Sequence, residues 1–280
     1  MTATAYLFPG QGVQEPEHER LVRELAPDLL DIALDQVGAN PFPRCGESTR
    51  FAQPAIVLAS LAAWRRLDAR DAAAFAGHSL GELSALAAAG AITETAAVRL
   101  AIVRGELMAQ AAEHRPGGTM LAVLGGTPEQ ALRLAEDHHL VLANDNAPGQ
   151  LVLAGSQDDV DAARREARGR GLRALELDVA GAFHSPQMQP AAQALTEELG
   201  AVVWTEPRAP VFSGLTATPF KDPIHELAAA VVAPVRWREL LLALRDSGVQ
   251  RFVDAGPGDV LSRLVDRTFK EPPNGVAVAA

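Results

Sequence analysis

The chain has 280 residues, of which 48% are hydrophobic and 21% are charged, so it can bury a large core and is not disordered as a whole. Its net charge of −10 at pH 7 argues against binding to nucleic acid or to an anionic membrane surface. No apolar run is long enough to cross a bilayer, so no membrane span is expected. The N-terminus lacks the basic segment of a signal peptide, and a cytoplasmic location is the default expectation.

Cys45 is the one cysteine, which excludes an intrachain disulfide. A lone cysteine can be a nucleophile, but this residue lies in the turn-rich stretch 40–47 with no motif around it. We interpret it as an incidental loop thiol. The sequence leads us to expect neither a metal site nor a cofactor.

The first 118 residues alternate short apolar strands with longer helices. The first strand ends in Pro9-Gly10-Gln11-Gly12, where two glycines around a glutamine allow backbone N–H groups to point at a ligand. The chain enters the second helix through Pro54. Apolar spacing predicts strands over 6–8 and 72–76, and helices over 18–37, 55–67, 82–89 and 96–112.

The pattern changes between residues 119 and 180. Here the predicted order is strand, helix, strand, strand, helix, strand, which is the order of a ferredoxin-like module. The strands are predicted over 120–124, 140–143, 151–154 and 172–179, and the helices over 128–138 and 156–170. We therefore predict an inserted subdomain over 119–180.

The remaining part of the chain returns to the alternation of the beginning. Helices are predicted over 187–199, 223–232 and 237–247, with strands over 210–213 and 251–254. Short apolar strands between helices indicate a parallel sheet covered on both faces. The predicted fold class is α/β, with a discontinuous parallel-sheet domain formed by 1–118 and 181–280.

Ser79 lies in Gly77-His78-Ser79-Leu80-Gly81, which matches the G-x-S-x-G nucleophile elbow. The elbow is a sharp turn from strand to helix, and it presents the serine at the tip of the sheet. An apolar strand precedes the motif and a strong helix follows it. The N–H of Leu80 falls at the helix N-terminus, where it can stabilise an oxyanion. Ser79 is thus predicted to be a nucleophile rather than a simple turn residue.

A serine nucleophile needs a base, and the chain has seven histidines. His184 follows the apolar residues 179–183 at what is predicted to be a strand end, where α/β folds present catalytic groups. His78 is inside the elbow and is expected to point away from the serine. Position alone makes His184 the leading candidate without settling the choice. The other histidines, at 18, 114, 138, 139 and 225, lie in polar or helix-start surroundings.

Several blocks together resemble the malonyl-CoA:acyl carrier protein transacylases, and they occur in that family's order. They are 8–12 (FPGQG), 51–55 (FAQPA), 77–82 (GHSLGE), 104–108 (RGELM), 144–150 (NDNAPGQ), 181–185 (GAFHS), 234–237 (PVRW) and 253–258 (VDAGPG). The resemblance implies an α/β-hydrolase-like domain interrupted by a ferredoxin-like subdomain, in agreement with the predicted insertion.

The resemblance also implies residue roles. Ser79 would be the nucleophile and His184 the general base, held by a backbone carbonyl shortly before Pro234 rather than by an aspartate. The oxyanion hole would use the backbone N–H groups of Gln11 and Leu80. In this family Ala230 is commonly replaced by Gln, which puts the orientation of His184 in question.

The same resemblance implies that two further residues bind substrate. Arg104 would hold the free carboxylate of a malonyl group, since its planar fork suits a carboxylate and burial of an unpaired Arg is costly. The alternative is an internal ion pair with Asp or Glu. In related polyketide acyltransferases an Ala-Phe-His pattern goes with malonyl, so Phe183 would crowd an α-methyl group; the alternative is a plain core residue.

The implied function is transfer of a malonyl group from coenzyme A to the phosphopantetheine thiol of an acyl carrier protein, in fatty-acid or polyketide synthesis. One alternative is a carrier-protein hydrolase using the same Ser79 and His184, and another is an inactive carrier-binding scaffold. A monomer is expected.

Because carriers are usually acidic, a basic docking face is expected on the inserted module. Its candidate residues are Arg164, Arg165, Arg168, Arg170 and Arg173. The alternative is that these arginines only form a solvated helix face.

Overall fold

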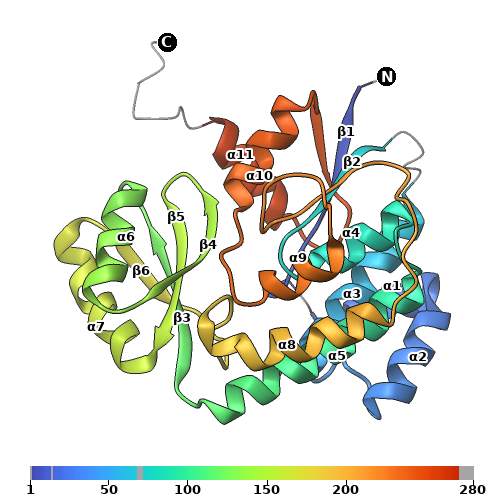
Figure 1. Ribbon diagram of the computed structural model, residues 1–280, viewed down its shortest axis with the longest axis horizontal. Helices are drawn as coiled ribbons and strands as arrows, with labels where there is room; N and C mark the ends of the chain where they lie inside the picture. The colour runs from blue at the N-terminus through green and yellow to red at the C-terminus, as the bar shows by residue number, and fades with distance from the viewer. Residues whose placement is uncertain (1, 14, 68–71, 271–280) are drawn as a thin grey trace.

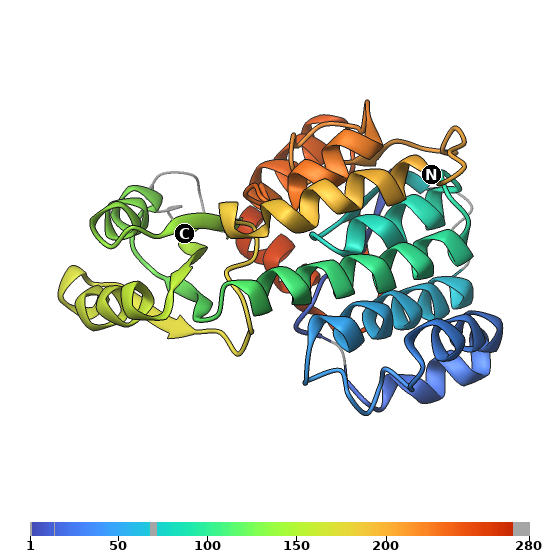
Figure 2. The same cartoon turned by 60° about the horizontal axis from the view of Figure 1, so that its bottom comes forward.

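The computed structural model describes residues 2–13, 15–67 and 72–270. Two sheets organise the chain, a parallel sheet in the larger part and an antiparallel sheet in the smaller part that projects from it (Figures 1 and 2). The larger part has an α/β-hydrolase-like arrangement and the smaller a ferredoxin-like one, as predicted. None of the helices in the described ranges is long and apolar enough to cross a membrane.

The parallel sheet has the order β7-β2-β1-β8. Its strands are β1 (Thr4–Phe8), β2 (Ala72–Gly77), β7 (Val211–Phe212) and β8 (Arg251–Asp254). Phe8 is paired with Gly77, so the loops that follow β1 and β2 leave the same edge of the sheet side by side. This register brings Gln11 and Ser79, which are far apart in the sequence, to one place.

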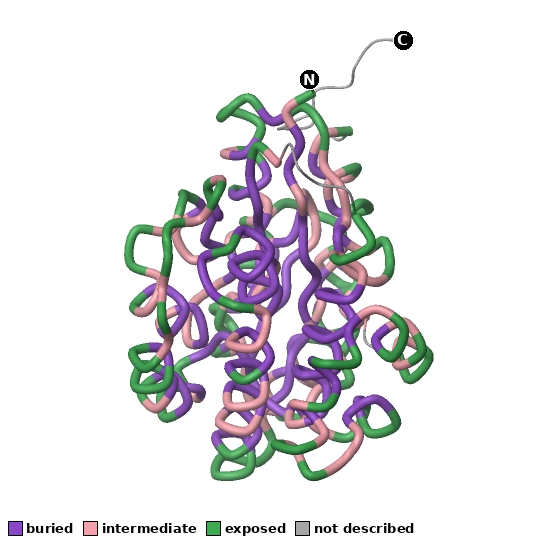
Figure 3. Tube along the Cα trace, turned by 90° about the vertical axis from the view of Figure 1, so that its right-hand side faces the viewer, coloured by how far each residue is buried: buried purple, intermediate pink, exposed green. Residues whose placement is uncertain are grey.

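Helices cover both faces of this sheet, and the apolar strands alternate between two buried clusters. Phe8 and Phe75 face the larger cluster, and Leu7 and Ala76 face the smaller one. The core runs as a buried band through the middle of the molecule (Figure 3). The larger cluster involves α1 (His18–Leu25), α2 (Pro27–Val37), α3 (Thr49–Arg66), α4 (Gly81–Ala89), α5 (Glu94–His114), α8 (Gln189–Gly200) and α9 (Pro223–Ala230); the smaller involves α10 (Trp237–Asp246) and α11 (Val260–Lys270).

The antiparallel sheet has the order β4-β5-β3-β6, with its own apolar core beneath two helices. Its elements are β3 (Gly118–Leu124), α6 (Pro128–Asp137), β4 (Val141–Ala147), β5 (Gln150–Ser156), α7 (Gln157–Ala167) and β6 (Arg173–Glu176). The division of the chain at 118/119 and 180/181 stays a prediction. The expected ends of the catalytic domain, Met1 and 271–280, lie outside the described residues.

A seam joins the two parts beyond the two chain crossings. Asn144 on β4 forms an isolated parallel bridge with Val235, and the Asp145 N–H donates to the Val235 carbonyl at 2.9 Å. Asp145 also accepts hydrogen bonds from Arg238, with 2.7 Å between Oδ2 and Nη2. We call these contacts of Asn144 and Asp145 with Val235 and Arg238 the β4 seam.

Some predicted boundaries are wrong. The helix expected over 18–37 is two helices, because Pro27 starts α2 and Ala26 leaves the helical conformation. The helix expected to begin after Pro54 begins at Thr49, where the Ser48 hydroxyl accepts the Arg50 N–H, and Pro54 is inside it. β4 continues to Ala147, through residues expected to form a turn. α11 had no sequence prediction.

Candidate active site

Ser79 is in a strained turn between β2 and α4. Its φ of 52° lies in the left-handed region that non-glycine residues rarely adopt. A side chain on Gly77 would place its Cβ 2.0 Å from the Glu82 nitrogen, and one on Gly81 would place it 2.1 Å from the Phe8 carbonyl oxygen. Close approach of the backbone therefore requires both glycines of the motif.

His184 lies against this serine, with 2.8 Å between Nε2 and Ser79 Oγ. Its Nδ1 is 2.8 Å from the carbonyl oxygen of Ala230 and 3.2 Å from that of Ala233. Because carbonyls only accept, Nδ1 carries the proton and Nε2 accepts from the serine. The expected strand end is wrong: β6 ends at Glu176, and His184 is in a turn with φ of 57°.

The backbone contact answers the question raised by Ala230. His184 is oriented by the main-chain oxygen at position 230, so the missing Gln side chain does not remove the contact that holds the ring. Burial, and then the charge of Arg104, lower the pKa of His184 to about 4. At neutral pH the imidazole is uncharged and can accept a proton.

Arg104 reaches the same serine from α5. Its Nη2 donates to Ser79 Oγ at 3.1 Å and its Nη1 to Gln53 Oε1 at 2.9 Å. Within the described residues the guanidinium forms no salt bridge, so the expected alternative of an internal ion pair is absent there. Burial lowers the pKa of Arg104 to about 10, opposed by the charge of Glu82, and the group remains a cation at pH 7.

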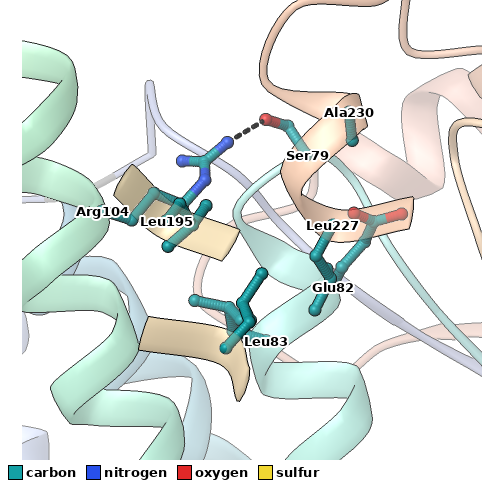
Figure 4. Close-up of a pocket in the computed structure, with 8 residues that line it drawn as sticks. Ser79, Glu82, Leu83, Arg104, Leu195, Leu227 and Ala230 are labelled. Atoms are coloured by element: carbon teal, nitrogen blue, oxygen red, sulfur yellow. Dashed lines mark hydrogen bonds between the residues drawn. The ribbon is translucent and has the colours of Figure 1, made fainter. Parts of the chain in front are cut away.

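A small cavity adjoins the serine and the guanidinium (Figure 4). Apolar side chains form much of its wall, including Leu83, Leu195 and Leu227, and Ala230 lies beside them. Figure 4 shows Arg104 pointing at Ser79. A charged group thus faces the elbow serine in apolar surroundings that offer little competing water.

Glu82, immediately after the elbow, lines the same cavity. It is buried, and its Oε1 accepts the Gly214 N–H at 2.7 Å. Burial raises the pKa of Glu82 to about 8, against the opposing effects of the Gly214 hydrogen bond and the Arg104 charge. Sequence reasoning gave this residue no role, although its position in the elbow block was a signal.

Gln53 is a second residue that sequence reasoning left without a role. It is fully buried on α3 and contacts Arg104, Gln11 and Met108. The block 51–55 that contains it was the signal.

Asn146 is a third such residue: its Oδ1 is 2.7 Å from His78 Nε2, and the His78 ring packs edge-on against Trp237. His78 thus contacts β4, and the histidine hydrogen-bonded to Ser79 is His184.

The two expected oxyanion donors lie on adjacent loops. Gln11 follows β1, Leu80 precedes α4, and the His78 N–H donates to the Phe8 carbonyl at 2.9 Å between these loops. Among the hydrogen bonds of the described residues, neither the Gln11 nor the Leu80 amide donates to a backbone carbonyl. Their joint role as an oxyanion hole stays a prediction.

Phe183 and Cys45 line a separate groove of about 750 Å³ that also contacts Gln11. Both side chains are buried. Phe183 is therefore placed in the same groove as Gln11 rather than in the wall of the Ser79 cavity, and its effect on an α-methyl group stays a prediction. Cys45 is on a turn, as expected, and contributes a thiol to the groove wall.

The arginines expected to form a docking face are partly neutralised. Arg164 pairs with Asp161 and Glu176, and Arg170 pairs with Asp137 and Glu166. Within the described residues no salt bridge forms at Arg165, Arg168 or Arg173. The face is thus mixed in charge. No group of three or more potential metal ligands occurs in the described ranges.

A serine in a strand-to-helix elbow, hydrogen-bonded to a neutral histidine, is the arrangement of enzymes that pass an acyl group through a serine ester. Comparison with known proteins makes the class definite. The model of the acyl transferase domain family matches residues 24–280. The chain belongs to this acyl transferase family, and the resemblance found in the motifs is confirmed.

Three relatives illustrate the similarity. The malonyl CoA-acyl carrier protein transacylase of Bacillus subtilis is 36% identical, over 95% of this chain and 90% of its own length. The polyketide biosynthesis protein ThaF of Burkholderia thailandensis is 36% identical over 99% of this chain, which spans only 25% of that protein. The solved structure of PlMCAT with AntF, a type II polyketide carrier protein with its malonyl-transacylase, has 30% identity and a TM-score of 0.86, covering 96% of this chain and 94% of that one. A hydrolase gains no support from these names.

Proposed function

We propose that the protein transfers a malonyl group from coenzyme A to the phosphopantetheine thiol of an acyl carrier protein, with Ser79 as the carrier of the acyl group. The observation that supports this most is the guanidinium of Arg104, which donates to Ser79 Oγ and has no carboxylate partner among the described residues. A buried cation beside the nucleophile suits an acyl group that brings its own carboxylate. A monoacyl chain would gain nothing from it, which disfavours the hydrolase.

In the first half-reaction His184 Nε2 takes the Ser79 proton while Oγ attacks the thioester carbon. The N–H groups of Gln11 and Leu80 would stabilise the oxyanion. The C–S bond then breaks, the sulfur of coenzyme A takes the proton from His184, and malonyl-Ser79 remains. The second half-reaction runs the same steps in reverse with the carrier thiol as nucleophile, and Arg104 holds the malonyl carboxylate throughout.

The groove lined by Gln11 and Phe183 is the proposed path of the pantetheine arm. Its wall combines apolar side chains with Arg44 and Arg50, each of which pairs with a carboxylate of the same wall, and with Asp178. A long, mostly neutral arm that ends in a thioester suits a wall whose charges largely offset one another. Two of the relatives named above have polyketide names and the third is named only as a malonyl CoA-acyl carrier protein transacylase, so the proposal covers either kind of carrier. The cytoplasmic location stays part of the proposal.

Intact-mass spectrometry of the protein after two successive additions tests the proposed function. The protein is incubated first with malonyl-CoA and then with a phosphopantetheinylated acyl carrier protein. We expect a malonyl adduct on Ser79 that moves to the carrier. Release of the adduct as free malonate would favour the hydrolase, and absence of any adduct would favour the scaffold. Ser79→Ala should give no adduct.

A further inference from the structure

Gln53 connects the two ends of the active site. Its Oε1 accepts from Arg104 Nη1 at 2.9 Å, and its Nε2 donates to Gln11 Oε1 at 3.0 Å. The same Nε2 is 3.2 Å from Met108 Sδ. The side chain is fully buried on α3, and each polar atom has a partner. It therefore has one well-defined orientation rather than a choice of several.

The chemistry of the partners fixes which way the amide faces. A guanidinium can only donate, so the Gln53 oxygen must face Arg104. The nitrogen then points to Gln11, whose own amide oxygen must accept. Arg104 is consequently held by an acceptor on Nη1 while Nη2 is directed at Ser79 Oγ.

We propose that Gln53 is a positioning residue for acyl-group specificity: it aims the Arg104 guanidinium at Ser79 and links it to the Gln11 loop. This inference rests on the proposed function. A neutral amide orients the cation without neutralising it, so the full charge is left for the carboxylate of the acyl group. A carboxylate at the same position would orient Arg104 equally well but would already satisfy its charge.

The link to Gln11 gives the same residue a second effect. Gln11 is on the loop whose backbone N–H is the proposed oxyanion donor, and it is one hydrogen bond away from the residue that holds Arg104. A carboxylate that settles on Arg104 is thus connected through Gln53 to the group that polarises the thioester. Binding energy from the remote carboxylate can then be used at the reacting carbon.

The test compares Gln53→Glu with the wild type in acylation of Ser79 by malonyl-CoA and by acetyl-CoA. We expect the malonyl-to-acetyl ratio of kcat/KM to fall by roughly 10- to 100-fold, the range of one charge-assisted contact. The loss should be larger in malonyl kcat/KM than in acetyl kcat/KM. Ser60→Ala, a buried change on the same helix at a hydroxyl without a partner among the described residues, is the matched control.

A double-mutant cycle shows whether Gln53 acts through Arg104. On an Arg104→Ala background, Gln53→Glu should leave the malonyl-to-acetyl ratio unchanged, because the charge it would neutralise is gone. An equal fall on both backgrounds would overturn the inference. If Gln53→Glu does not fold, Gln53→Met removes the acceptor at similar length, and an unchanged ratio in that variant would overturn it as well.

Failure of the inference and failure of the function give different results. If wild-type Ser79 accepts neither acyl group, the proposed function is wrong and the inference falls with it. If the wild type prefers malonyl and the Gln53 variants keep that preference, the function stands and the inference is wrong.

Discussion

At the scale of single residues, His184, the base that we propose, is unusual in its support. His184 Nδ1 faces two backbone carbonyls and no carboxylate, and its surroundings include the cation of Arg104. A carboxylate would stabilise the imidazolium, whereas carbonyls mainly fix the ring and its tautomer. The result is a weak base that is neutral over most of the pH range.

This predicts the pH dependence of acylation. Burial and Arg104 lower the pKa of His184 to about 4, so lowering the pH protonates the base only in strongly acidic solution. The rate of Ser79 malonylation should stay level from about pH 8 to about pH 5 and fall below that. Quenched-flow measurement after a rapid pH jump checks this, and a midpoint near the ordinary histidine value would contradict it.

Arg104 carries a prediction about the acyl group. Arg104→Ala should lower the preference for malonyl over acetyl by roughly 10- to 100-fold, because a charge-assisted hydrogen bond contributes about 1.5–3 kcal/mol. The exposed Arg99 on the same helix gives the control Arg99→Ala, which should leave the ratio unchanged. The ratio is measured by letting malonyl-CoA and acetyl-CoA compete for Ser79 and recording the intact mass of the protein. Retained selectivity in Arg104→Ala would refute the proposal that Arg104 holds the malonyl carboxylate.

Residues in motifs could be predicted, and residues that act through distant partners could not. Ser79 and Arg104 stand in blocks with a recognisable pattern. Gln53 depends on contacts with Gln11, Arg104 and Met108 that are 42, 51 and 55 positions away along the chain. Only the packing of α3 against α5 and the β1 loop creates them, and neither periodicity nor composition contains that information.

At the scale of elements, the residues that start and end helices explain which boundaries could be predicted from the sequence and which could not. The strands and most helices were predicted because their apolar spacing is regular. The break between α1 and α2 was missed because the spacing continues across Pro27, while the lost N–H and the ring of proline start a new helix there. The start of α3 was misplaced because Ser48 supplies a cap six residues before Pro54.

The elbow allows an element-scale prediction. Gly81→Ala should destabilise the protein, because the new Cβ would lie 2.1 Å from the Phe8 carbonyl oxygen and force β1 and α4 apart. Overpacking of this kind costs about 1–3 kcal/mol or more. Gly46→Ala is the matched control, since nothing lies within 4 Å of its added Cβ. Thermal unfolding measures both, and equal midpoints would show that the elbow tolerates the atom.

At the scale of the whole molecule, the active site buries a carboxyl group that makes the stability of the fold depend on pH. Glu82 is buried behind the serine, and burial raises its pKa from 4.5 to about 8. The native protein therefore keeps a proton that the unfolded chain releases within that window. The contribution of Glu82 to the free energy of unfolding is therefore greatest below pH 4.5, and this contribution is lost as the pH rises towards 8.

Glu82→Gln tests this linkage. The amide oxygen can still accept the Gly214 N–H, but the side chain cannot ionise. The variant should lose less stability than the wild type between about pH 5 and about pH 8, as measured by urea unfolding at each pH. Glu113→Gln, an exposed change, should run parallel to the wild type. Parallel behaviour of Glu82→Gln would show that the pKa of Glu82 is not raised in the folded protein.

The β4 seam has a consequence for recombining this chain with its relatives. The small sheet resembles a cassette inserted between two crossings, yet Asn144 and Asp145 pair with Val235 and Arg238, and Asn146 contacts the elbow at His78. A chimera that exchanges 119–180 alone would disturb these contacts, which the junctions do not reveal. Such a cassette should be transplanted together with its matching residues at 78, 235 and 238, because the turn that holds Ser79 is hydrogen-bonded to the insertion through His78 and Asn146.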